Sequence, residues 1–168
     1  MFEVLPKLHA IRDDFVVIAG NPSQKILNDE LEKRCGKYNY IKLTDDSFNR
    51  DEYRLIAKHA MIAVGLYAED TFGGTAAREC VDLGCIPFWS DIHSYKNLAI
   101  ESGWNRGYMC QPDLTDAHTT LAALVGKIVS GKDEDICVGL KRLQAVVRER
   151  CSYECTTIPA MKIMDLEG

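Results

Sequence analysis

The run of residues 61–67, Met-Ile-Ala-Val-Gly-Leu-Tyr, constrains the fold more than any other part of this sequence. It is apolar throughout rather than alternating between apolar and polar residues. A strand with this pattern is buried on both faces, which is typical of a parallel sheet covered by helices on either side. A strand with one solvated face would alternate instead. The chain is therefore expected to belong to the α/β class.

Strand and helix patterns alternate along the rest of the chain. Strands are predicted at residues 15–20, 38–43, 61–67, 85–90 and, more weakly, 108–110. Helices are predicted at residues 23–35, 49–60, 75–83, 95–101, 114–130, 134–150 and 154–164. This order predicts a Rossmann-like open parallel sheet with helices on both faces. No linker, repeat or low-complexity stretch interrupts it, so residues 1–168 are expected to form a single domain.

Composition narrows the possible partners. The chain has 168 residues and a formal net charge of −5, with no cluster of Lys and Arg. Nucleic-acid binders normally carry a basic stripe, so no nucleic-acid partner is evident. No apolar run approaches the roughly 18 residues of a membrane span, and the N-terminal residues lack a signal-peptide pattern. The 7 cysteines form no Cys-x-x-Cys pair and lie mostly in apolar runs, as expected for reduced core residues of a cytoplasmic protein.

The stretch after residues 61–67 is the strongest candidate site. In open parallel sheets, ligands bind beyond the carboxyl ends of the strands. Here two glycines lead directly into a predicted helix. Glycines let backbone amides approach a ligand closely, and the free N–H groups of a helix start attract an anion such as a diphosphate. The candidate binding residues are Phe72, Gly73, Gly74 and Thr75, together with Gly20 at the end of the first strand.

Acidic residues surround the same loop. Glu69 and Asp70 precede the glycines, and Glu79 lies about one turn into the predicted helix. Carboxylates accept hydrogen bonds from sugar hydroxyls, so these acids favour a sugar-bearing ligand, with Glu79 in reach of a ribose diol. A simpler interpretation is also open, in which the glycines only form a turn and the acids are solvated. No Walker lysine and no dinucleotide Gly-x-Gly-x-x-Gly motif is present.

These residues resemble a known family. Residues 63–74, Ala-Val-Gly-Leu-Tyr-Ala-Glu-Asp-Thr-Phe-Gly-Gly, and residues 79–87, Glu-Cys-Val-Asp-Leu-Gly-Cys-Ile-Pro, resemble the C-terminal domain of glycosyltransferase family 4. That family has an acid, then Phe-Gly, then Glu-Ala-x-x-x-Gly-x-Pro before a strand. The resemblance extends to residues 16–20, 51–60, 90–91 and 148–154, which is nearly the whole chain.

The resemblance implies the donor-binding half of a GT-B-type retaining glycosyltransferase. Its donor would be a nucleotide-diphosphate sugar, with no metal or other cofactor. Glu69 and Asp70 would be the catalytic acids and Glu79 the ribose ligand. An acceptor-binding domain or subunit would be the partner, and the chain alone is expected to be inactive. The alternative is a non-catalytic module that binds a nucleotide or nucleotide-sugar, and a relic that binds nothing is a third hypothesis.

The sequence departs from the family in two respects. One extra residue lies between the two acidic positions, within residues 74–78, so the sugar could face Glu69 or Asp70 and the ribose Arg78 or Glu79. The family's Gly-Arg strand and Lys-Gly pair, which contact the donor diphosphate, have no counterpart here. The chain is expected to begin inside the helix after that strand.

Other candidates have simpler explanations. His59 is expected to pack or to lie on the surface, and Phe88 and Trp89 to lie in the core. His93 follows Ser90-Asp91 in a loop on the ligand side, but no Gly-x-Ser-x-Gly elbow supports a hydrolase triad. Tyr53 and Tyr67 are expected to pack in the core or at the rim, with a base-binding pocket as the alternative. The charged residues of 141–150 are expected to form a solvated helix face.

Overall fold

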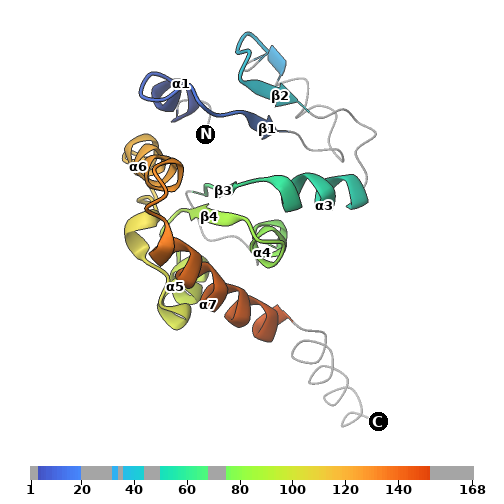
Figure 1. Ribbon diagram of the computed structural model, residues 1–168, viewed down its shortest axis with the longest axis vertical. Coiled ribbons are helices and arrows are strands. Elements are labelled where there is room, and N and C mark those ends of the chain that lie inside the picture. The colour runs from blue at the N-terminus through green and yellow to red at the C-terminus, as the bar shows by residue number, and fades with distance from the viewer. Residues whose placement is uncertain (1–3, 20–31, 34–35, 44–49, 68–74, 152–168) are drawn as a thin grey trace.

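The computed structural model describes residues 4–19, 32–33, 36–43, 50–67 and 75–151. Helices and short parallel strands alternate, which confirms the α/β class (Figure 1). The strands are β1 (Val17–Ala19), β2 (Ile41–Leu43), β3 (Ile62–Gly65) and β4 (Ile86–Trp89). The helices are α1 (Val4–His9), α3 (Arg50–His59), α4 (Thr75–Asp82), α5 (His93–Ser102), the 3-10 turn η1 (Arg106–Tyr108), α6 (Ala117–Val129) and α7 (Glu134–Cys151).

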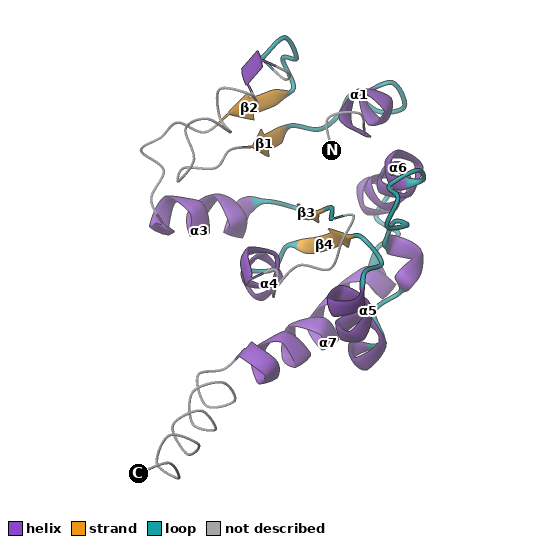
Figure 2. Cartoon of the chain, turned by 180° about the vertical axis from the view of Figure 1, so that it is seen from behind, coloured by secondary structure: helices purple, strands orange, loops and turns teal. Residues whose placement is uncertain are grey.

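The described strands form two small parallel sheets. β1 pairs with β2 from Val17↔Ile41 to Ala19↔Leu43, and β3 pairs with β4 from Ile62↔Ile86 to Gly65↔Trp89. Among the described residues no ladder joins the two pairs. The chain runs through β1 and β2 in roughly the opposite direction to β3 and β4 (Figures 1 and 2). A single open sheet therefore stays a prediction.

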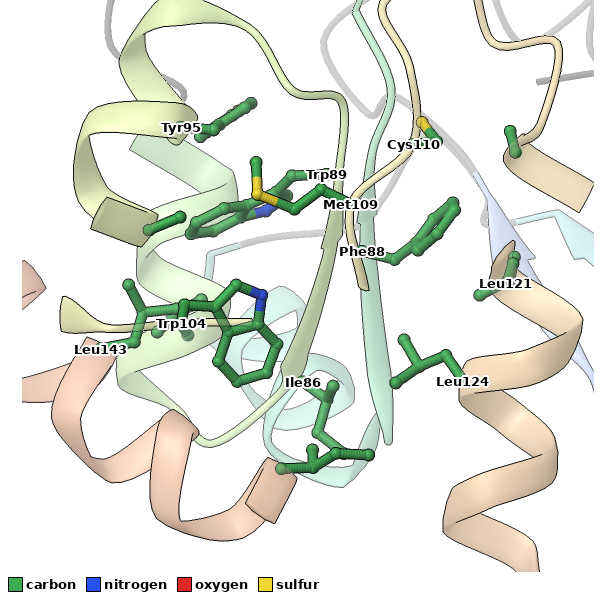
Figure 3. Packing of buried hydrophobic residues seen from close by; sticks show 14 of the residues in the cluster. Ile86, Phe88, Trp89, Tyr95, Trp104, Met109, Cys110, Leu121, Leu124 and Leu143 are labelled. Carbon is green, nitrogen blue, oxygen red and sulfur yellow. The ribbon is translucent and has the colours of Figure 1, made fainter. Parts of the chain in front are cut away.

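β4 lies at the centre of the main core. All its residues are buried, with Phe88 and Trp89 both 0% exposed. The two rings leave opposite faces of the strand: Phe88 packs toward Leu121 and Leu124 of α6, while Trp89 lies on the side of Trp104 and of Leu143 on α7 (Figure 3). Burial on both faces explains why this strand is apolar without alternation. The prediction that Phe88 and Trp89 are core residues is confirmed.

Helix α1 was not predicted from the sequence. It buries Val4, Leu5 and Leu8 and packs against α6. His9, at its end, stacks on Tyr40 with ring centroids 4.0 Å apart. Proline is tolerated in the first turn of a helix because its missing N–H has no partner there, so the proline at position 6 does not prevent this short helix.

The predicted strand at residues 108–110 is only partly correct. Its first residue closes η1, and Cys110 then forms an isolated parallel bridge with Ser90. The backbone N–H of Cys110 donates to the Trp89 carbonyl at 3.0 Å, and the N–H of Asp91 donates to the Cys110 carbonyl at 2.8 Å. The segment thus adds one parallel contact beyond the carboxyl end of β4.

The cysteines do not all behave as core residues. Cys85 and Cys110 are 0% exposed, whereas Cys80 is half-buried. Cys137 is exposed on α7, so the expectation of a core position is wrong there; it points about 100° away from its buried neighbour Ile136. The charged residues 141, 142 and 148–150 on the same helix are exposed, which confirms the solvated face. None of the described helices has the length and apolarity needed to cross a membrane.

Candidate functional site

Most of the predicted site falls outside the described residues. This applies to the catalytic candidates Glu69 and Asp70 and to the binding candidates Gly20, Phe72, Gly73 and Gly74. Thr75 is described through its backbone, as the first residue of α4. Helix α4 therefore begins directly after the glycine-rich loop, where the sequence placed a helix start.

Ser90 links the carboxyl ends of β3 and β4. The backbone N–H of Tyr67, just beyond β3, donates to Ser90 Oγ at 2.8 Å, and Ser90 is 0% exposed. The Ser90 backbone N–H donates to the Gly65 carbonyl at 3.2 Å. Both bonds hold the start of the 68–74 loop against the end of β4. At Gly65 a side chain would meet Trp89 Cδ1 at 3.0 Å, so the small residue allows this close approach.

An aromatic layer lies beside these strand ends. The ring of Tyr95 stacks on Trp89 with centroids 4.5 Å apart, and Tyr67 lies 6.2 Å from Tyr95. Tyr95 is 1% exposed, and its hydroxyl makes no hydrogen bond with any described residue. Burial raises the pKa of Tyr95 to about 12, and nearby Arg78 acts in the opposite direction. The layer thus offers a neutral phenol and a neighbouring guanidinium.

Tyr95 was not predicted as a site residue from the sequence, and Arg78 was left as an alternative to Glu79 for the ribose contact. Tyr95 lies in the first turn of α5, after the Ser90-Asp91 pair. Its position five residues beyond the predicted ligand-side serine is a weak signal, because a tyrosine in a first helical turn usually packs. Arg78 lies in the fourth position of α4, within one turn of the glycine loop.

Glu79 faces α3 instead of the strand ends. Its carboxylate forms an ion pair with Arg54 of α3, with the Nε–Oε1 distance at 3.4 Å. Adjacent residues on a helix point about 100° apart. Arg78 therefore points in another direction than Glu79, and Glu79 would reach a ligand at the strand ends only by giving up its contact with Arg54.

The serine, aspartate and histidine after β4 do not converge. Asp91 forms a bidentate ion pair with Arg106 of η1. His93 is exposed, and its Nε2 lies 3.3 Å from Nδ2 of Asn97. The Ser90 hydroxyl accepts the Tyr67 N–H and also makes a hydrogen-bond contact with the Cys110 thiol. This arrangement is structural and provides no activated nucleophile.

The sequence analysis also considered Tyr53, as a packing residue or part of a base-binding pocket, and His59, as a packed or surface residue. The Tyr53 hydroxyl lies 3.1 Å from the carbonyl oxygen of Ala76 and 3.0 Å from Cys80 Sγ, so this tyrosine joins α3 to α4. His59 is exposed on α3 and lines an apolar hollow of about 230 Å³ with Ile18 and Leu55. Neither side chain belongs to the strand-end site. Tyr67, at 38% exposed, lies at the rim of that site.

In the described part of the chain, no group of three or more His, Cys, Asp or Glu side chains could hold a metal ion. The arrangement at the strand ends has a different character: a helix start, a guanidinium and a buried phenol lie around the beginning and end of the 68–74 loop. Those groups suit an anion that also carries hydroxyl groups. Comparisons of this chain with protein-family models, with curated proteins and with solved structures found no match.

Proposed function

We propose that this chain is the donor-binding domain of a retaining glycosyltransferase that uses a nucleotide-diphosphate sugar. The observation that carries the proposal is the β3–α4–β4 unit. Its two parallel strands end side by side, and α4 begins directly after the glycine-rich loop. Ligands of parallel α/β sheets bind beyond such strand ends, and the start of a helix is a favourable place for a diphosphate.

Arg78 supports the diphosphate part of the proposal. This chain lacks the two basic groups that contact the donor diphosphate in glycosyltransferase family 4. Arg78 lies in the first turn of α4, and its positive charge acts on the pKa of Tyr95 at the strand ends. A guanidinium can bind a phosphate through two parallel N–H···O bonds. Arg78 therefore takes the role of the missing basic groups.

Glu79 remains the proposed ribose ligand, at a modest cost. Its partner Arg54 has a side chain that is 50% exposed, and Glu79 itself is 24% exposed. Ion pairs at such positions stabilise a protein by about 0–1 kcal/mol. Replacing the ion pair with Arg54 by hydrogen bonds to a ribose diol would therefore cost little stability. Glu69 or Asp70 would contact the transferred sugar from the intervening loop.

The proposal includes the single open sheet of the GT-B half. β1 and β3 each have one edge that pairs with no described strand. Ile18 on β1 is 53% exposed and Val64 on β3 is 37% exposed. An unpaired edge presents free backbone N–H and C=O groups, to which a further strand can add. The two pairs run in roughly opposite directions (Figure 1), so joining them as one parallel sheet would require the N-terminal pair to turn round.

Nucleotide titration tests the binding step. UDP, GDP, ADP and their sugar conjugates would be titrated into the protein by calorimetry, at low and at high salt. We expect at least one to bind, and Arg78→Gln to weaken binding by about 1.5–3 kcal/mol, which is the loss of a charged hydrogen bond. Arg148→Gln, a matched change at an ion pair with Asp82 at the C-terminal end of α4, should leave binding unchanged. No binding at millimolar concentration, or equal losses in both variants, would contradict the proposal.

Transfer is tested separately, because the reacting carbon of such an enzyme lies between two domains. Holding two reactants together is worth roughly 7–11 kcal/mol, and a domain that binds only the donor lacks that contribution. The purified chain is expected to hydrolyse the donor slowly at most, and to transfer sugar only beside an acceptor-binding domain or subunit. Donor binding without transfer in the presence of that partner would overturn the enzymatic part and indicate a non-catalytic binding module.

A further inference from the structure

The C-terminal end of α4 brings two cysteines together. The backbone N–H of Cys85 donates to the Cys80 carbonyl at 2.9 Å, and that of Gly84 donates to the Val81 carbonyl at 3.0 Å. Gly84 has φ +104°, in the left-handed region. These bonds define a Schellman motif, in which the side chains at the first and last positions frequently contact each other. In this chain both of those residues are cysteines.

The backbone geometry suits a disulfide between them. With a carbonyl-to-amide hydrogen bond of 2.9 Å, standard bond lengths keep the two Cα atoms within about 7 Å of each other. Disulfides usually join Cα atoms about 4.4–6.8 Å apart. Both thiols are free in this structure. The pair can therefore be bridged with little movement of the chain.

The surroundings give the two thiols different characters. Cys80 is half-buried, and its sulfur lies 3.0 Å from the Tyr53 hydroxyl. Cys85 is 0% exposed, and its sulfur lies 2.9 Å from the Ala57 carbonyl oxygen, to which it donates. Hydrogen bonds from Cys85 and Tyr53 lower the pKa of Cys80 to about 6, although burial and Glu79 act against this. The contact with Cys80 and burial raise the pKa of Cys85.

The contacts make Cys80 the thiol of the pair that ionises more readily. The Tyr53 hydroxyl and the Cys85 thiol both adjoin its sulfur, and each has one proton that it can turn from a backbone carbonyl to a negative sulfur. Cys85 carries a single proton, which it can give either to the Ala57 carbonyl or to Cys80. A negative sulfur attracts that proton more strongly, since hydrogen bonds to a charged acceptor are about twice as strong as neutral ones. The geometry thus pairs an accessible thiolate with a buried, protonated thiol.

We propose that Cys80 and Cys85 form a reversible dithiol–disulfide pair that is oxidised by hydroperoxides, with Cys80 as the attacking thiol and Cys85 as the resolving thiol. The Cys80 thiolate attacks one peroxide oxygen, so that an S–O bond forms and the O–O bond breaks. The leaving alkoxide or hydroxide takes a proton from water, and Cys80 is left as a sulfenic acid. The Cys85 sulfur then attacks the Cys80 sulfur, and the S–O bond breaks.

The second step releases water, because the departing hydroxide takes the proton of Cys85. Overall the two thiols lose two electrons and two protons, and the peroxide is reduced to an alcohol and water. An external dithiol reverses the change by thiol–disulfide exchange. The pair lies at the end of α4 away from the glycine-rich loop, so this inference does not depend on the proposed nucleotide site.

The other described cysteines lack this arrangement. Cys110 is buried, and its pKa is raised to about 11 by burial. Its hydrogen-bond partner is the Ser90 hydroxyl, and the partner of Cys137 is a carboxylate oxygen of Asp133 at 3.6 Å. Burial and Asp133 raise the pKa of Cys137. Both therefore serve as internal controls for reactivity.

Peptide mapping of the full chain provides the test. The protein would be treated with hydrogen peroxide, blocked with iodoacetamide and cut with trypsin. Residues 79–96 contain no internal Lys or Arg, so one peptide carries both cysteines. We expect that peptide to be lighter by two hydrogen atoms, to be unalkylated, and to regain both alkylation sites after dithiothreitol. Alkylation of both sites, at peroxide doses that oxidise Cys137, would overturn the proposal.

Single substitutions test the order of the steps. In Cys85→Ser, the sulfenic acid of Cys80 should accumulate and be trapped by dimedone, because no resolving thiol is present. In Cys80→Ser, Cys85 should stay reduced. Cys110→Ser should leave the disulfide unchanged. Oxidation of Cys85 in Cys80→Ser at the rate seen for Cys80 would refute the assigned roles, and the mapping of the unsubstituted chain decides the proposal even if a variant does not fold.

Discussion

Ser90→Ala removes the hydroxyl that connects the ends of β3 and β4. That hydroxyl accepts the backbone N–H of Tyr67 at 2.8 Å and also contacts the Cys110 thiol. Ser90 is 0% exposed, so water cannot easily take the place of the hydroxyl. The substitution leaves an amide without its partner at the start of the 68–74 loop. We expect a lower free energy of unfolding and faster amide exchange at Tyr67.

The magnitude follows from the burial. An unsatisfied buried donor costs about 1–3 kcal/mol, and we expect the free energy of unfolding to fall by that amount. Ser130→Ala is the matched control, because its hydroxyl also makes one hydrogen bond, to the Lys127 carbonyl at 3.0 Å, but at an exposed helix end. Surface substitutions of this kind usually change stability by less than about 0.5 kcal/mol.

Urea unfolding followed by tryptophan fluorescence measures the stability of both variants. Trp89 and Trp104 are buried in the core and report its loss. Amide hydrogen exchange at Tyr67 measures the local effect, because the N–H that loses its acceptor should exchange faster. Equal stability of Ser90→Ala and Ser130→Ala, together with unchanged exchange at Tyr67, would refute the view that Ser90 holds the strand ends together.

Two further predictions follow from the packing and from the thiols. Gly139→Ala should lower the free energy of unfolding by about 1–3 kcal/mol through overpacking, because a Cβ there would meet Trp104 Cε3 at 3.1 Å; urea unfolding checks this, and unchanged stability would mean that the indole shifts freely. The rate of Cys80 alkylation by iodoacetamide should rise with pH through its pKa of about 6, while that of Cys110 should rise only toward its pKa of about 11, because the thiolate is the reactive form. Equal pH profiles for the two thiols would contradict the assigned pKa difference.

The sequence predicted the centre of the fold well. β4 was expected at residues 85–90 and is found at Ile86–Trp89, buried on both faces. α3 and α4 end within one or two residues of their predicted limits. Here local pattern and tertiary structure agree, because an apolar run without alternation has few ways to avoid burial. The predicted helix start at Thr75, which defines the candidate site, belongs to this part.

The features that the sequence did not predict depend on distant partners. α1 is a short helix, and its stability comes from Val4 and Leu8 packing against α6, more than 100 residues away in the chain. Short helices are marginal without such packing. The stacking of Tyr95 on Trp89 likewise depends on how α5 folds back over β4. A local pattern contains no information about either contact.

The orientation of α4 decides which of its charged side chains a ligand would meet. Val81 is 0% exposed and fixes the buried face of the helix. Glu79 is turned toward Arg54, and the charge of Arg78 is near enough to Tyr95 to act on the pKa of its phenol. The resemblance assigns Glu79 to the ribose, whereas the geometry brings the guanidinium nearer to the strand ends. If Arg78→Gln weakens nucleotide binding more than Glu79→Gln, the diphosphate contact dominates, and the extra residue between the two acidic positions has turned the helix by about 100° relative to the family pattern.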